Sequence, residues 1–383
     1  MAAATEAPIQ FSRPFMDERE ASAAAEAIRS GWIVAGPRLA ELEKKMATYG
    51  AAAEGIGTSS WTSAAFLTLH AWGIGPTDEV IVPSLTFIAS VNVVRQVGAR
   101  VVFADIDPAT WNIDPADVAR KITSRTRAIL PIDQIGLPCD IDAISELARP
   151  RGIKVLQDAA CSFASCSHGR PIGNLADATV FSLHARKVVT TGEGGMILTD
   201  DRKLAERLRR LRHQGMSLSD YQRHGASPTL FETYPEVGFN HRITDIQAAV
   251  GLVQFDKLPE ILKRRRAVAA RYSRHLGNHA LLRPPYVPEG LEPNWQSYQV
   301  QLRPGARMGR NEIMERLHGM GIPTRRGVMA SHLEAPYRPE RAALPHTEHA
   351  AATTFQLPMH PGLDEGQVGR VLAAIDKVAA QLP

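Results

Sequence analysis

The chain from Phe181 to Thr199 reads FSLHARKVVTTGEGGMILT. An apolar run ends near His184, Lys187 follows it, a turn rich in Thr and Gly comes next, and a second apolar run begins at Gly195. This pattern predicts two short buried strands joined by a turn that the glycines permit. A lysine at the end of a strand can project into a cleft, where partial loss of water favours the neutral, nucleophilic amine. The alternative is a β-hairpin whose lysine lies in solvent.

Short apolar runs of the same kind recur through the first two-thirds of the chain, with helical patterns such as 141–149 and 203–212 between several of them. Nearly continuous apolar strands that alternate with helices are typical of a mostly parallel sheet covered on both faces. The sequence therefore predicts an α/β fold built as a three-layer sandwich. The predicted strands are residues 79–83, 100–105, 128–132, 153–158, 178–183 and 195–199.

The pattern changes near Thr244, where longer helical stretches begin. A segment with four prolines at 284–293 predicts a loop. We therefore expect a large domain over residues 1–255, with an N-terminal arm, and a smaller α+β domain over 256–383. The predicted elements here are helices at 246–255, 261–276, 311–320 and 365–380 and a strand at 295–302.

Composition excludes several classes of protein. The chain has 383 residues, 44% of them hydrophobic, and no apolar run of about 18 residues, so a spanning helix is not expected. The net charge of +4 is modest, which argues against nucleic-acid binding. Cys139, Cys161 and Cys166 lack metal-binding spacing, so we expect no metal site and no disulfide framework. These features predict a reduced, cytoplasmic protein that binds no membrane.

Three further stretches contain candidate ligands. Asp158 ends a predicted strand, where open α/β sheets bind ligands, and its carboxylate could hold a pyridinium N–H; the alternatives are a helix cap and an ion pair. Thr62 and Ser63, in GTSSWTSAA from Gly57, precede a helical run and could bind a phosphate, or simply cap the helix.

Phe87, in VPSLTF, follows another predicted strand and could stack on a flat ring, or lie in the core. An amine, a carboxylate, a phosphate cradle and a ring stacker are together the groups needed to hold pyridoxal phosphate (PLP). The conjunction predicts a PLP site.

Segments along nearly the whole chain resemble the DegT-type sugar aminotransferases, which are PLP enzymes of fold type I. The most specific is FSLHARKVVTTGEGG from Phe181, and others are SGWIVAGPRLAELE from Ser30, GFNHRITDIQAAVGLVQ from Gly238 and GIPTRRGVMASH from Gly321. The order and spacing of these segments carry the resemblance.

The resemblance implies a role for each matching position. Lys187 would bind PLP covalently and later move the proton between the cofactor and the substrate carbon. Asp158 would bond the pyridine nitrogen, and Phe87 would stack on the ring. Asn240 would reach the phosphate from the neighbouring subunit of a homodimer, and His332 would contact substrate. The phosphate itself would be bound by Thr62, Ser63 and Ser182.

Three positions depart from the family pattern. Trp61 replaces a residue that is often small, so we expect it to narrow or reshape the cofactor edge. Cys161 lies among the cofactor-binding positions where His or Gln is common, which would remove a polar contact to the cofactor oxygen. Asp133 stands where histidine is common.

The expected reaction is a ping-pong transamination. An amino donor, L-glutamate, would convert PLP to pyridoxamine phosphate, and a nucleotide-diphosphate-linked keto-sugar would take up the amine in amino-sugar biosynthesis. Arg325 and Arg326 could meet an anionic group, or belong to a solvated basic loop. Because Lys187 is present, the family's dehydratase branch, which carries histidine there, is not expected.

Two other functions remain open at this point. One is a PLP enzyme that acts on a free ketone, such as a cyclitol or another secondary-metabolite intermediate. The other is a non-catalytic regulator with the PLP fold, for which the basic runs 207–213 and 263–266 are the best support, although such runs are usually solvated helix faces.

Overall fold

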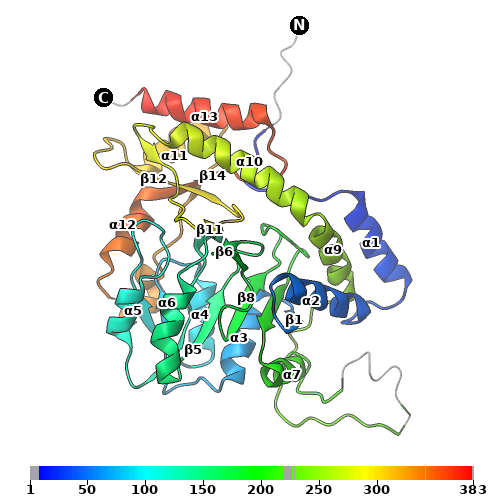
Figure 1. Ribbon diagram of the computed structural model, residues 1–383. Helices are drawn as coiled ribbons and strands as arrows, with labels where there is room; N and C mark the ends of the chain where they lie inside the picture. Colours follow the sequence, from blue (N-terminus) through cyan, green and yellow to red (C-terminus); the bar gives the residue numbers. More distant parts are fainter. Residues whose placement is uncertain (1–7, 219–226, 228, 341, 382–383) are drawn as a thin grey trace.

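The computed structural model describes residues 8–218, 227, 229–340 and 342–381. Its centre is a seven-stranded sheet in the order β1-β9-β8-β5-β4-β2-β3 (Figure 1). Five neighbouring strands, from β8 to β3, run parallel, and β9 is antiparallel to both β8 and β1. The predicted mostly parallel sheet is confirmed. The strands are β1 Glu54–Thr58, β2 Glu79–Pro83, β3 Arg100–Ala104, β4 Thr126–Ile129, β5 Lys154–Asp158, β8 Ala178–Ser182 and β9 Gly195–Thr199.

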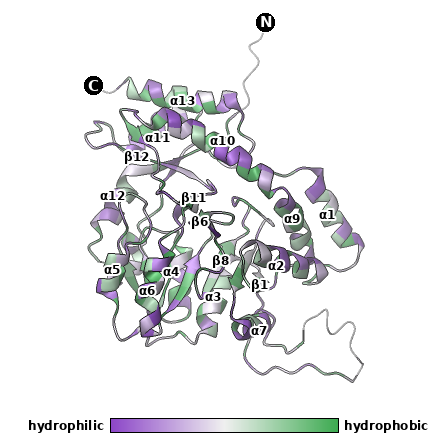
Figure 2. Ribbon diagram, in the orientation of Figure 1, coloured by the Kyte–Doolittle hydropathy of each residue, from purple (hydrophilic) through white to green (hydrophobic). Residues whose placement is uncertain are grey.

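Alternate residues of the strands enter cores on opposite faces of the sheet, as the period of two requires. Val80 and Val82 of β2 pack with α3, α4 and α7, whereas Ile81 between them packs with α5 and α6. Phe181 of β8 faces a third cluster, which contains α2. Helices therefore cover both faces, and the three-layer prediction is confirmed; Figure 2 shows hydrophobic residues gathered in these interior layers. The covering helices are α2 Pro37–Tyr49, α3 Trp61–Ala71, α4 Ala89–Gln96, α5 Pro115–Lys121, α6 Ile141–Ala148 and α7 Arg202–Leu211.

The C-terminal part contains a second sheet, of four antiparallel strands in the order β10-β12-β14-β13. Its strands and helices share a core cluster of their own, which includes Tyr298, Phe355 and Val371. The predicted division into domains at residue 255 stays a prediction. The elements are β10 Leu282–Arg283, β12 Tyr298–Leu302, β13 Arg325–Arg326, β14 Thr354–Leu357, α10 Leu258–Leu276, α11 Arg310–Gly319, α12 Pro345–Thr353 and α13 Glu365–Ala379.

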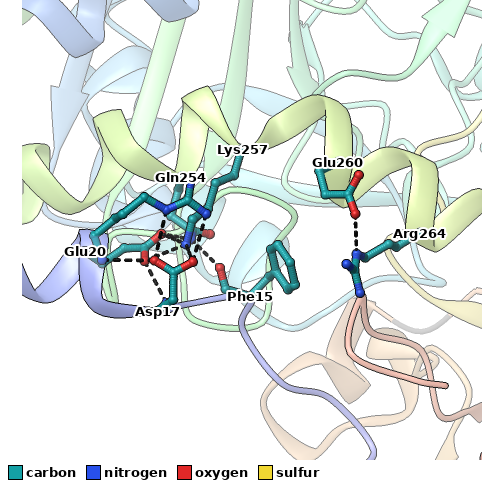
Figure 3. A network of polar contacts seen from close by, with 8 residues as sticks. Phe15, Asp17, Glu20, Gln254, Lys257, Glu260 and Arg264 are labelled. Atoms are coloured by element: carbon teal, nitrogen blue, oxygen red, sulfur yellow. Dashed lines mark hydrogen bonds and ion pairs between the residues drawn. The ribbon is translucent and has the colours of Figure 1, made fainter.

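A buried polar network ties the N-terminal helix α1 (Glu18–Arg29) to α9 (Asp245–Asp256) and to the start of α10 (Figure 3). Lys257 Nζ lies 2.7 Å from the Glu20 carboxylate and 3.0 Å from Asp17 Oδ2. Gln254 Nε2 donates to Glu20 Oε1 at 2.6 Å and to the Phe15 carbonyl at 2.7 Å. Because Glu20 and Lys257 are only 3% and 4% exposed, their charges depend on each other.

A third, small sheet joins the two main parts of the chain. It has the order β11-β6-β7, with β11 Leu291–Glu292, β6 Cys166–Ser167 and β7 Arg170–Pro171. The predicted loop 284–293 therefore contains the short strand β11 near its end. This strand pairs with β6, which lies in the connection between β5 and β8 of the large sheet. Among the described residues, no helix is both long and apolar enough to cross a membrane.

Candidate active site

Asp158 ends β5, beside the end of β8, and its side chain is 3% exposed. Ser90 Oγ donates to Asp158 Oδ2 at 2.7 Å, and the Ala160 N–H donates to Oδ1 at 3.0 Å. Burial raises the pKa of this carboxyl to about 6, although the Ser90 and Ala160 hydrogen bonds and the charge of Lys187 lower it. The result is a fixed, buried carboxylate that a positively charged partner would stabilise.

Lys187 lies in the turn between β8 and β9, half-buried. The two strands do form an antiparallel hairpin, but the lysine does not extend freely into solvent. Its Nζ contacts Cys161 Sγ at 3.1 Å. The turn closes through the Lys187 N–H to the His184 carbonyl and the Ala185 N–H to the Gly192 carbonyl, both at 2.8 Å. Gly192 has φ +86°, a conformation that favours glycine.

The start of α3 supplies a cluster of hydroxyl groups. Ser60 is the N-cap, since its side chain accepts from the Ser63 N–H, and Ser63 Oγ lies 3.0 Å from the hydroxyls of Ser59 and Ser60. The residue that caps the helix is therefore Ser60, and not Thr62 or Ser63, for which capping was the alternative to phosphate binding. The role of Thr62, Ser63 and Ser182 as phosphate ligands stays a prediction.

Two aromatic residues of the predicted site differ in their exposure to solvent. Phe87, just after β2, is 67% exposed, so the alternative that it lies in the core is wrong. Trp61 is only 6% exposed and packs in the core cluster under α3. The expected narrowing or reshaping of the cofactor edge by Trp61 stays a prediction.

Asn240 is exposed, and the next residue lies against the α3 cluster, where the Ser59 N–H donates to the His241 carbonyl at 2.9 Å. The predicted contribution of Asn240 to a neighbouring subunit stays a prediction.

The three predicted substrate contacts belong to the C-terminal part of the chain. The His332 ring is fully buried, with Nδ1 2.6 Å from Ser84 Oγ and Nε2 3.3 Å from Glu348 Oε1, so it supports the segment after β2. Arg325 and Arg326 are exposed on β13. Arg325 lies over the Phe11 ring, 5.4 Å from its centroid. Their predicted contacts with substrate stay predictions.

Asp133 and its hydrogen-bond partners form a buried polar cluster beside β5 that was not predicted as part of the site. Asp133 is fully buried and accepts from Ser162 Oγ at 2.5 Å, from Gln157 Nε2 and from the Cys139 N–H. Burial raises the pKa of Asp133, against these hydrogen bonds. The only feature of the sequence that pointed to Asp133 was its departure from the family pattern. No feature of the sequence pointed to Ser90, which donates to Asp158.

A separate hollow of about 750 Å³ lies between the start of α2 and the end of α7, lined by residues such as Arg209, Arg210 and Arg212. It contains none of the predicted site residues. These arginines are paired with acidic side chains, Arg209 with Glu54 at 2.8 Å and Arg210 with Glu236 at 3.2 Å. The basic run that supported a regulator is thus largely neutralised within the protein.

Comparisons with known proteins agree with this geometry. A model of the DegT/DnrJ/EryC1/StrS aminotransferase family matches residues 14–376. GDP-perosamine synthase of Caulobacter vibrioides is 38% identical over 375 residues, which cover 97% of this chain and 98% of that protein. The aminotransferase TlmJ from Streptoalloteichus hindustanus has a TM-score of 0.91 at 34% identity, covering 98% of this chain and all of that one.

A third likeness is to Spr1654 from Streptococcus pneumoniae. Its structure in the pyridoxamine phosphate (PMP) form has a TM-score of 0.92 at 27% identity and covers 98% of this chain and 100% of that one; a PLP form is also known. With a lysine and a buried carboxylate at the ends of neighbouring strands, the fold and these likenesses define a transaminase. The chain belongs to the DegT/DnrJ/EryC1/StrS aminotransferase family.

Proposed function

We propose that the protein is a PLP-dependent aminotransferase that moves the amino group of L-glutamate to a keto-sugar in amino-sugar biosynthesis. The single observation that carries the proposal is the pair formed by Lys187 and the buried Asp158, whose charges interact at the ends of neighbouring strands. Family membership and the name GDP-perosamine synthase support transamination of a nucleotide-linked sugar.

The residues present fit the cofactor. Asp158 would hold the pyridine nitrogen, and its buried carboxylate gains a compensating positive partner there. The hydroxyls and N–H groups at the start of α3 would hold the phosphate, since a helix N-terminus favours anions. Phe87 is an exposed aromatic ring that is free of the core and suited to stacking. When bound, PLP supplies an electron sink that lets a proton leave the substrate carbon next to the nitrogen.

Different side chains would transfer the proton, hold the carboxylate and bind the substrates. Lys187 takes and returns that proton through Nζ, the role of a general base and acid. Ser90 and the Ala160 N–H hold Asp158 in one orientation, so the carboxylate does not reorganise during the reaction. Arg325 and Arg326 are proposed to meet the anionic groups of the substrates, and His332 is proposed to contact them.

We also propose that the active unit is a cytoplasmic homodimer in which Asn240 serves the neighbouring subunit, with a large domain over residues 1–255 and a smaller one over 256–383. Large apolar side chains more than half exposed lie shortly before Asn240, and a second copy would cover them. These side chains are Leu230, Phe231, Tyr234 and Val237.

The test compares Lys187→Ala with Lys203→Ala, a matched change on the exposed face of α7. Both proteins are supplied with L-glutamate and, side by side, with nucleotide-linked keto-sugars and free cyclitol ketones, and 2-oxoglutarate and amine product are measured. We expect turnover of the nucleotide-linked ketone by Lys203→Ala alone. Turnover by Lys187→Ala would overturn the mechanism, and exclusive use of free ketones would overturn the proposed acceptor.

A further inference from the structure

The loop between β11 and β12 reaches back to the candidate active site. Asn294 in this loop is fully buried, and its Nδ2 donates to the carbonyls of Cys161 and Phe163, each at 2.8 Å. Its main-chain N–H donates to Ser165 Oγ at 3.0 Å. The Asn294 side chain therefore fixes the main chain at Cys161 and Phe163. These two residues lie in the segment that follows β5 and its last residue, Asp158.

Gln296, two residues after Asn294, binds the turn that carries Lys187. Its Nε2 donates at 2.8 Å to the carbonyl of Arg186, the residue before Lys187. Its own N–H donates to Asn294 Oδ1 at 2.8 Å, so the two amides form one unit. The hydrogen bonds of the 184–192 turn described above are local, whereas this one reaches Arg186 from 110 residues away.

The loop has little freedom to move. Arg265 of α10, which is 2% exposed, donates through Nη1 to the carbonyls of Trp295 and Gln296, each at 3.1 Å. On the opposite side a Cβ added to Gly136 would lie only 2.3 Å from Asn294 Oδ1, which indicates close packing without a gap. A loop fixed at both sides can transmit its position to the groups that it holds.

We propose that Asn294 and Gln296 are positioning residues that set how closely Lys187 Nζ approaches Cys161 Sγ, a separation of 3.1 Å. The consequence for catalysis rests on the proposed function of Lys187. A lysine has a long, flexible side chain, so its amine is placed accurately only if its main chain is fixed. Displacement by about 1 Å can slow a reaction roughly a hundredfold, so anchoring of the Arg186 carbonyl affects proton transfer at Nζ.

The first test measures proximity in the full-length, cofactor-free protein. o-Phthalaldehyde joins a neighbouring thiol and amine into a fluorescent isoindole, and peptide mass spectrometry identifies a product between Cys161 and Lys187. We expect Gln296→Leu, which keeps the volume but removes the donor, to slow this product about tenfold, equivalent to roughly 1.4 kcal/mol. Cys161→Ser identifies the product, because it should form none.

The matched control is Gln299→Leu. Gln299 is also fully buried, but its Oε1 accepts from the Val328 N–H at 3.3 Å, away from the site. We expect it to leave the isoindole rate at the wild-type value. Equal rates in Gln296→Leu and wild type, or equal slowing in both leucine variants, would overturn the proposal.

Two further variants keep the test informative if Gln296→Leu does not fold. Asn294→Asp keeps its size but removes the donors to Cys161 and Phe163, so we expect slower isoindole formation. Gln296→His restores an N–H donor and should recover the rate. An unchanged rate in Asn294→Asp would contradict the proposal.

The second readout is a single turnover of the PLP-loaded enzyme with L-glutamate. We expect Gln296→Leu to slow it about tenfold while changing the PLP dissociation constant less than about twofold, because the loss concerns proton transfer and not cofactor binding. If wild-type protein does not react with glutamate, the proposed function fails, whereas the isoindole result still decides the positioning role. A loss confined to PLP affinity would contradict positioning of Lys187.

Discussion

At the scale of single residues, Asp158 shows a conflict between stability and function. A buried carboxylate without a cationic ligand is unfavourable, and burial raises its pKa from 3.8 to about 6. Because the folded-state pKa is the higher one, the folded state binds this proton more tightly than the unfolded chain does. The ionised Asp158 carboxylate therefore lowers the free energy of unfolding of the cofactor-free protein most above pH 6. This destabilisation disappears below about pH 4, where the carboxyl is protonated in both states.

This conflict predicts that Asp158→Asn stabilises the cofactor-free protein while impairing catalysis. The difference between 3.8 and about 6 corresponds to roughly 3 kcal/mol. This is an upper bound, because Ser90 and the Ala160 N–H donate to different carboxylate oxygens and asparagine has only one oxygen that can accept. We expect the free energy of unfolding to rise by about 1–3 kcal/mol at pH 8 and by only about a third of that amount at pH 4.5. Urea denaturation at both pH values measures this, and a loss of stability at pH 8 would contradict it.

At the scale of elements, the contact between α1 and the start of α10 depends on buried charges. Burial by itself raises the pKa of Glu20, but the Asp17 N–H, Lys257 and Gln254 outweigh it and lower the pKa below 4.5. A lowered pKa means that the carboxylate contributes stability above its unfolded value, and that this contribution is lost as pH falls through the folded-state pKa. The N-terminal helix is therefore expected to detach first in acid.

Lys257→Met tests this contact, because it leaves Glu20 charged and buried without its cationic partner. We expect the free energy of unfolding at pH 7 to fall by about 3–5 kcal/mol. Lys263→Met, on the exposed face of the same helix, should change it by less than about 0.5 kcal/mol. Thermal or urea unfolding compares the two, and equal losses would show that the network does not stabilise the fold.

The elements also show what sequence patterns can reveal. The apolar runs predicted six of the seven strands of the large sheet, but they missed β1, whose sequence EGIGT contains two glycines. Strand β4 ends at Ile129 and not at Ile132. Pro131 explains this, because it has no N–H to donate to a neighbouring strand. Strand β14 was missed, since TFQL is short and its partner β12 lies more than 50 residues away in sequence.

The candidate site follows the same logic. Lys187 and Asp158 lie next to strand ends, so a local pattern pointed to them. Asn294 and Gln296 come from a loop whose hydrogen bonds reach back more than 100 residues, and no local pattern indicates such a contact. The burial of His332 and Trp61 likewise depends on tertiary packing.

At the scale of the whole molecule, the proposed homodimer predicts that two inactive chains restore each other. In a mixed dimer of Lys187→Ala and Asn240→Ala chains, one site combines an intact Lys187 with the intact Asn240 of the other chain. Random mixing gives half mixed dimers with one working site each, so about a quarter of wild-type activity should return. Activity is measured after the chains are co-refolded.

Each variant refolded alone serves as the control and should remain nearly inactive. If Asn240 acted within its own chain, no mixed dimer would contain a complete site, and mixing would restore nothing.

The most direct test of the central claim is the visible absorbance of the purified, PLP-supplied protein before and after L-glutamate is added. We predict a yellow band in the wild type that fades to the shorter-wavelength PMP form with glutamate, and no such covalent band in Lys187→Ala. A wild-type protein that develops no band with PLP would contradict the account.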